Sequence, residues 1–202
     1  MLQTGITPDF ITVDGGEGGT GAAPPEFSDR VGMPLLQGLS MTHALLVGAG
    51  LRDRVKIIAS GKILTGFSIV EAMAIGADVT NSARAMLFAL GCIQALKCNT
   101  NKCPTGITTL DPRLMNGLVV PDKAERVYRY HQKTVHVALE IIGALGLDSP
   151  NLVRPEHIMN TGDYGEILTL SKVYPHLNIQ SGALLENQGE ASVLKLWNAA
   201  RV

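Results

Sequence analysis

Three short strand-like segments, each followed by a helical pattern, constrain the fold of this chain more than any other feature. The segments are FITV at Phe10–Val13, VKIIA at Val55–Ala59 and ADVT at Ala77–Thr80. The helices that follow them are expected at about Leu39–Leu51, at Ser68–Ile75 and from Arg84 onward. Short segments of this length, rich in Val, Ile and Ala, are typical of parallel strands. The alternation predicts an α/β fold with a parallel sheet or barrel, in which Phe10–Val13 is a buried strand.

The composition agrees with that fold and argues against several other classes. The chain has 202 residues with 22 glycines and only 4% aromatic residues, which suits aliphatic strands joined to helices by tight turns. This length allows one domain with a core, or one domain and a tail. The formal net charge of −1 argues against a nucleic-acid or polybasic membrane partner. Because no membrane-length apolar run or secretory signal is evident, we expect a cytoplasmic protein.

Residues suited to ligand binding follow each expected strand. The first strand leads into Asp14–Pro24, which contains five glycines within seven residues. Glycine lets a backbone approach a ligand closely, and α/β enzymes bind ligands at the carboxyl ends of parallel strands. The other two strands end in Ser60-Gly61-Lys62 and Ser82-Ala83-Arg84. They indicate a phosphate site with positive charge from Lys62 and Arg84, and solvated surface charges are the alternative.

All three cysteines lie in one segment, GCIQALKCNTNKCPTG, from Gly91 to Gly106. They are Cys92, Cys98 and Cys103, with the spacing C-x5-C-x4-C. An odd number of thiols excludes complete disulfide pairing within the chain. An iron–sulfur cluster suits three irregularly spaced thiols better than structural zinc, which usually takes four ligands in paired motifs. Because free cysteine is often buried, three core residues are a further alternative.

The second half of the chain contains one long amphipathic helix and a less regular C-terminal part. The helix is expected at about Lys123–Leu145, with Asp122 as its cap and Gly146 ending it. Residues 160–202 carry no motif that we can assign, and they either pack as an extension or stay partly loose. His43 lies in the first expected helix, where an isolated histidine is more often structural than part of a pocket.

Three blocks of residues, in this order, resemble the FMN-binding glutamate synthase family. They are GGTGAAPP at Gly18–Pro25, LRDRVKIIASGKILTG at Leu51–Gly66 and GCIQALKCNTNKCPTGITTLDP at Gly91–Pro112. The resemblance covers about residues 1–157, and its third block has the family's cysteine spacing. The chain departs from the family at the strand ends. Glu17 replaces an aspartate, Ala59-Ser60-Gly61 replaces D-G-G, and Asn81 and Ala83 replace a glycine pair.

The resemblance implies the C-terminal portion of a TIM (β/α)8 barrel, about three βα units that begin near its sixth strand. It divides the chain into a partial barrel at residues 1–157, with the cysteine loop at 91–106, and a C-terminal helical extension at 158–202. Three βα units cannot close such a barrel. We therefore expect a truncated or split member of the family, with a partner chain that supplies the missing barrel half or electrons.

The resemblance also implies the chemistry of a glutamate synthase. FMN and a [3Fe–4S] cluster would reduce 2-iminoglutarate, formed from 2-oxoglutarate and ammonia, to glutamate. Cys92, Cys98 and Cys103 would ligate the cluster. The FMN phosphate would be held by Gly61, Lys62, Ala83 and Arg84. The flavin and the keto acid would face Gly18, Gly19, Thr20 and Gly21, and Glu17 and Thr20 would line the substrate pocket.

Two other functions remain open at this point. One is a non-catalytic remnant, or a cluster-carrying subunit that passes electrons to a partner chain. The other is an FMN barrel oxidoreductase that acts on hydroxy acids or nucleotides. Enzymes of that second type do not need three clustered thiols, so the cysteines argue against it.

Overall fold

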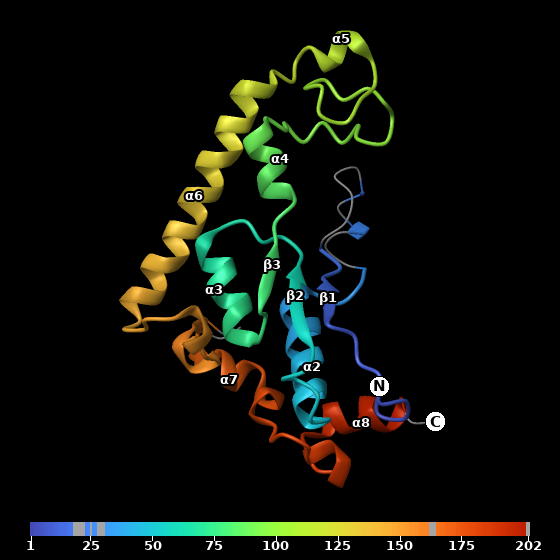
Figure 1. Cartoon of the computed structure of the whole chain (residues 1–202), viewed down its shortest axis with the longest axis vertical. Helices are drawn as coiled ribbons and strands as arrows, with labels where there is room; N and C mark the ends of the chain where they lie inside the picture. The colour runs from blue at the N-terminus through green and yellow to red at the C-terminus, as the bar shows by residue number, and fades with distance from the viewer. Residues whose placement is uncertain (18–22, 25, 28–30, 162–164, 201–202) are drawn as a thin grey trace.

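Three parallel strands form the centre of the fold, and helices pack against them (Figure 1). The computed structural model describes residues 1–17, 23–24, 26–27, 31–161 and 165–200. The sheet has the order β1-β2-β3 and consists of β1 (Phe10–Asp14), β2 (Lys56–Ser60) and β3 (Val79–Asn81). The helices that follow along the chain are α2 (Leu35–Gly48), α3 (Gly66–Ile75), α4 (Arg84–Leu90), α5 (Pro112–Met115) and α6 (Val120–Ala144). The predicted α/β fold with a parallel sheet is confirmed.

The register of the sheet places the carboxyl ends of all three strands at one edge. Residues 10–14 of β1 pair in order with residues 56–60 of β2, and residues 58–60 of β2 pair with residues 79–81 of β3. All these pairings are parallel. The segments that leave the three strands therefore begin side by side.

The core lies around β2, which has a neighbouring strand on each side. Ile57 and Ala59 of this strand are fully buried, together with Leu39 of α2 and Val70 of α3. β1 differs from the expectation of a buried strand, because its residues alternate between exposed and half-buried and Phe10 is 58% exposed. Helices normally cover both faces of a parallel strand. In the described part of the chain, β1 pairs on one side only, so that prediction is wrong for this chain.

Two helix starts differ from the predicted positions. Helix α2 begins at Leu35, directly after Pro34, four residues earlier than expected. Helix α6 begins at Val120 with a proline in its first turn, so Asp122 lies inside that turn and does not cap the helix. Proline favours the start of a helix because its φ is already helical and its missing N–H would have no partner there. The predicted cap at Asp122 is therefore wrong.

The predicted end of the long helix is confirmed. Gly146 has a φ of +76°, and its N–H donates to Gly143 O at 2.9 Å. The next N–H, that of Leu147, donates to Ile142 O at 3.1 Å. These bonds satisfy the last carbonyls of α6 around a left-handed glycine, as is common at helix ends. None of the helices in the described part of the chain has the length and apolar composition of a membrane span.

The C-terminal region packs against two helices in the described part of the chain: its first two 3-10 turns lie against α3, and its last two 3-10 turns and α8 lie against α2. It contains the antiparallel pair β4 (Met159–Thr161) and β5 (Ile167–Thr169), the helices α7 (Leu170–Val173) and α8 (Ala191–Ala199), and four 3-10 turns, at Pro150–Leu152, Pro155–His157, Pro175–Asn178 and Ala183–Glu186. Leu170, Leu184 and Val193 are fully buried. His176 Nε2 lies 2.9 Å from the Oγ of Ser40, which is itself buried in α2. Of the two alternatives for residues 160–202, packing as an extension is confirmed for the residues described.

We expect Ser40→Ala to lower the free energy of unfolding by about 1–3 kcal/mol, because it leaves the buried His176 without its hydrogen-bond partner. Urea unfolding followed by circular dichroism measures the change. Ser181→Ala, at an exposed position, is the matched control and should change little. Equal stability of the two variants would show that the Ser40–His176 contact does not hold the C-terminal region in place.

Candidate functional site

The carboxyl edge of the sheet brings together the loops that were expected to bind a ligand. The N–H of Gly15 donates to the carbonyl of Ser60 at 2.8 Å, which joins the loop after β1 to the end of β2. The hydroxyl of Ser82 donates to the carbonyl of Ile63 at 2.7 Å, which joins the loops after β2 and β3. The predicted proximity of the three strand ends is therefore present.

The four residues expected to hold a phosphate lie on two adjacent loops of this edge. Gly61 and Lys62 have φ values of +137° and +46°, so the chain turns sharply after β2. Ala83 is the N-cap residue of α4 and gives the helix no side-chain cap. Arg84 follows as the first residue of that helix. Backbone amides at a helix start and the charges of Lys62 and Arg84 suit a phosphate group.

The first glycines of the loop after β1 are needed for packing within the protein. A Cβ atom on Gly15 would lie 2.6 Å from the backbone nitrogen of Leu35, and one on Gly16 would lie 2.8 Å from the carbonyl of Val31. The N–H of Gly16 also donates to Met33 O at 2.8 Å. These glycines therefore let the loop lie against the segment that leads into α2. Gly18, Gly19, Thr20 and Gly21, which were also expected in the site, lie outside the described residues.

Glu17 connects this loop to the start of α2. Both of its carboxylate oxygens accept a hydrogen bond from the N–H of Leu35, at 2.8 and 3.0 Å. A negative charge at a helix start satisfies a free N–H group and interacts favourably with the helix dipole. In this structure Glu17 therefore acts as the cap that α2 does not obtain from Pro34.

The three cysteines are free thiols on the segment between α4 and α5. Cys103 is buried, whereas Cys92 and Cys98 are half-buried. The sulfur of Cys103 lies 3.4 Å from the hydroxyl of Thr105, and the N–H of Gln94 donates to the sulfur of Cys92 at 3.4 Å. The hydrogen bond with Thr105 is the main cause that lowers the pKa of Cys103 to about 6, and it outweighs the opposing effect of burial. A thiolate is the form of cysteine that binds metals.

Thiols are the donors that hold iron–sulfur clusters. The three thiols of this segment are not close enough together in this structure to bind one metal ion. Among the described residues, no three side chains of His, Cys, Asp or Glu lie close enough together to hold a metal ion. The three thiols are nevertheless confined to twelve consecutive residues, 92–103. Gln94, Leu96 and Asn101 in this segment have left-handed backbones. Cluster binding would therefore require a local closure of this one segment.

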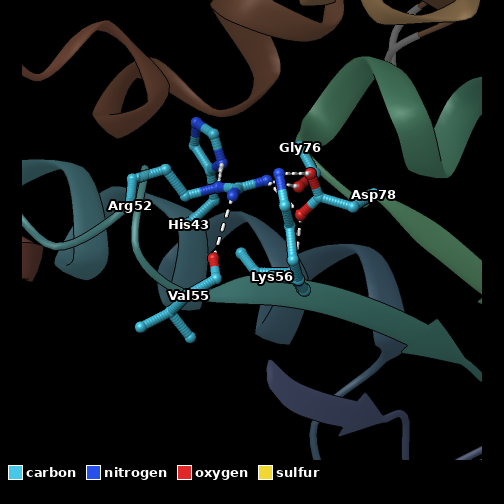
Figure 2. A network of polar contacts seen from close by, with 7 residues as sticks. His43, Arg52, Val55, Lys56, Gly76 and Asp78 are labelled. Carbon is cyan, nitrogen blue, oxygen red and sulfur yellow. Dashed lines mark hydrogen bonds and ion pairs between the residues drawn. The ribbon is translucent and has the colours of Figure 1, made fainter. Parts of the chain in front are cut away.

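A second polar cluster lies at the opposite, amino edge of the sheet (Figure 2). Arg52 is at its centre and donates from Nη2 to Asp78 Oδ2 at 2.7 Å and to the carbonyl of Gly76 at 2.8 Å. Its Nη1 donates to Val55 O at 3.0 Å, and its Nε donates to Nδ1 of His43 at 3.2 Å. The guanidinium thus joins α2, the start of β2 and the turn before β3.

His43 therefore has the structural role that the sequence favoured. Burial, and secondarily the charge of Arg52, lower its pKa to about 4. Partial burial would raise the pKa of Asp78, but the N–H of Ile57 and the guanidinium of Arg52 lower it overall. The sequence pattern alone does not predict the roles of Arg52 and Asp78. The signals that it contains are two arginines, Arg52 and Arg54, before the second strand and a single aspartate directly before the third.

Comparison with known proteins identifies the family. The family model "Conserved region in glutamate synthase" matches residues 2–148. The chain belongs to the glutamate synthase family. It is 43% identical over 173 residues to the glutamate synthase large subunit-like protein YerD of Bacillus subtilis (strain 168), a match that covers 86% of this chain and 33% of that protein.

Two further members show the same pattern of partial coverage. The archaeal glutamate synthase [NADPH] of Methanocaldococcus jannaschii is 37% identical, over 72% of this chain and 29% of its own length. The glutamate synthase [NADPH] large chain of Azospirillum brasilense is 36% identical, over 72% of this chain and 9% of its own. This glutamate synthase family chain thus spans about a third of YerD and of the archaeal protein, and far less of the large chain.

We expect acid to destabilise the protein through His43. Its pKa is 6.5 in an unfolded chain and about 4 in the folded state, so between these values only the unfolded chain binds the proton. The stabilising contribution is complete above pH 6.5 and is lost as the pH falls toward 4, by up to about 3 kcal/mol.

Urea unfolding of the protein and of His43→Gln across this pH range measures the difference. The variant should show a flatter dependence, whereas His131→Gln, at an exposed position, should follow the unmodified protein. The lowered pKa of His176 contributes in both proteins, so it cancels in the comparison. Parallel curves for the protein and His43→Gln would contradict the prediction.

Proposed function

We propose that this chain is the flavin-phosphate-binding and cluster-binding part of a glutamate synthase-type oxidoreductase that reduces 2-iminoglutarate to glutamate. The observation that carries the proposal is the C-x5-C-x4-C segment within a chain of the glutamate synthase family. Cys92, Cys98 and Cys103 would hold a [3Fe–4S] cluster. The hydrogen bond from Thr105 supports this role, because it favours the thiolate of Cys103 before any metal binds.

FMN is the second proposed cofactor. Its phosphate would be held by the backbone at Gly61 and Ala83 and by the charges of Lys62 and Arg84. The support is that these residues leave adjacent strands at one edge of the sheet. Together the two cofactors would supply the electrons that reduce the imine formed from 2-oxoglutarate and ammonia.

The substrate would lie over the glycine loop, with Gly18, Gly19, Thr20 and Gly21 facing the flavin and the keto acid. The family resemblance places Glu17 in the same pocket. Its carboxylate already accepts the N–H of Leu35, so we propose that it positions the start of this loop against α2. Thr20 remains the proposed pocket residue that touches the substrate.

The sheet would form the last three strands of a TIM (β/α)8 barrel, in a domain of residues 1–157 followed by an extension at 158–202. The support is the parallel order β1-β2-β3, which leaves both outer strands open on one side in the described part of the chain. Because the chain spans about a third of YerD, the remaining strands would come from additional sequence or from a partner chain. A cluster-carrying subunit without catalysis of its own is the second candidate, and the same partial coverage favours it.

We also propose a cytoplasmic location, because three free cysteines are stable in a reducing compartment.

Anaerobic reconstitution with iron and sulfide tests the cluster. We expect about three irons and four sulfides per chain with broad visible absorbance, because three thiolates are the ligands available. Cys98→Ser should lose both iron and absorbance, whereas the neighbouring exposed variant Asn99→Ser should keep them. Stoichiometric zinc without iron, or an unchanged spectrum in Cys98→Ser, would refute the assignment.

Binding of FMN and riboflavin separates recognition of the phosphate from recognition of the ring. Arg84→Ala should weaken FMN binding by about tenfold or more, because it removes a charged hydrogen bond to the phosphate, and riboflavin binding should be unaffected. Flavin fluorescence quenching measures both affinities. Arg54→Ala, an exposed arginine near the amino edge of the sheet, is the matched control. An equal effect of Arg84→Ala on both flavins would contradict the phosphate role.

A further inference from the structure

Two side-chain hydroxyls from other parts of the fold hold the loop that follows β2. The hydroxyl of Tyr130, on α6, donates to the carbonyl of Leu64 across 66 positions of the chain. The hydroxyl of Ser82, which follows β3, donates to the neighbouring carbonyl of Ile63 at 2.7 Å. Two consecutive carbonyls of this loop are therefore directed toward α6 and toward the loop after β3.

Ser68 fixes the end of the same loop from within α3. Its Oγ accepts the N–H of Leu64 at 3.1 Å and the N–H of Thr65 at 2.9 Å. Thr65 Oγ1 accepts the N–H of Ser68 at 3.2 Å in return, which completes the capping box of α3. Because both N–H groups are engaged within the protein, a phosphate bound to this loop would meet its earlier part, at Gly61 and Lys62.

Helix α6 comes close enough for Tyr130 to reach this loop because residue 66 is a glycine. A Cβ atom on Gly66 would lie 2.6 Å from the backbone nitrogen of Ala138 and 2.9 Å from the carbonyl of Thr134. Tyr130, Thr134 and Ala138 are spaced by four residues, so they lie on one face of α6. Figure 1 shows α6 running beside α3, against which it packs. This face of α6 therefore supports the loop after β2.

The conformation of the loop explains why it needs this support. Lys62 has a φ of +46°, a left-handed conformation that non-glycine residues adopt only where their surroundings hold them. A peptide carbonyl carries partial negative charge on its oxygen, so a carbonyl that turned toward a bound phosphate would repel it. The hydroxyls of Tyr130 and Ser82 hold the two carbonyls that follow Lys62 away from such a position.

We propose that Tyr130 is a positioning residue for the flavin phosphate. Through its hydroxyl, α6 holds the loop after β2 in the conformation that presents Gly61 and Lys62 to the phosphate. Tyr130 acts through the loop and not by contact with the phosphate. The inference rests on the proposed function, because it concerns the same phosphate site. It extends that function by giving a role to α6, which carries none of the expected site residues.

Binding of FMN and of riboflavin to the full chain, measured by flavin fluorescence quenching, tests this role. Tyr130→Phe removes only the hydroxyl, and we expect it to weaken FMN binding by about fivefold and to leave riboflavin binding unchanged. A merely structural role would change both affinities or neither. Tyr128→Phe removes a hydroxyl from the same helix at an exposed position, and this matched control should bind both flavins like the unmodified chain.

The outcomes separate the role of Tyr130 from the proposed function. If the unmodified chain prefers FMN to riboflavin and Tyr130→Phe keeps the whole preference, the role of Tyr130 is overturned and the phosphate site stands. If the unmodified chain does not prefer FMN, the phosphate site fails and the role of Tyr130 fails with it.

Hydrogen–deuterium exchange measures the hold on the loop without any flavin. Amides of residues 61–65 should exchange several-fold faster in Tyr130→Phe than in the unmodified chain, because the loop loses one of the contacts that hold it. Mass spectrometry of peptic peptides gives the rates, and residues 56–60 of β2 are the internal reference. Equal exchange of residues 61–65 in Tyr130→Phe and Tyr128→Phe would overturn the proposal. Faster exchange of β2 as well would also overturn it, because the whole fold would then have loosened.

Discussion

The guanidinium of Arg52 is the interaction on which the arrangement of the strands depends. It joins a helix, a strand start and the turn before the next strand through hydrogen bonds to His43, Val55, Gly76 and Asp78. Gly76 is also required here, because a Cβ atom at that position would lie 2.1 Å from Nδ1 of His43. A network of this kind fixes the amino ends of β2 and β3 relative to α2. With those ends fixed, the parallel register aligns the opposite ends, where the loops of the candidate site begin.

The sequence predicts where the strands and helices lie better than it predicts where a helix starts or how exposed a strand is. Apolar runs and helical spacing are local signals, so each strand and the end of α6 at Gly146 could be located within a few residues. The start of α2 depends on Glu17, a contact across 18 positions of the chain, and no local pattern encodes it. The exposure of β1 depends on what pairs with its outer side. That information is absent from residues 10–14 themselves, because an apolar strand has the same sequence whether or not a neighbour covers it.

One part of the candidate site can be predicted from the sequence and another part cannot. The proximity of the strand ends follows from parallel pairing alone, so the loops at Gly61 and Ala83 could be placed together from sequence. The contacts of Arg52 with His43 and Asp78 join residues 9 and 26 positions apart, and only the folded chain reveals them. The properties of Cys103 are only partly predictable from the sequence. Its hydroxyl neighbour Thr105 is visible in the sequence, but the lowered pKa requires the two side chains to turn toward each other.

The outer side of β1 is the open edge of this sheet. In the described part of the chain no strand pairs with that side, and Phe10 on the same strand is exposed. A further strand would pair with these backbone groups and cover the side chain at once. A strand edge is recognised through backbone hydrogen bonds, which are indifferent to charge.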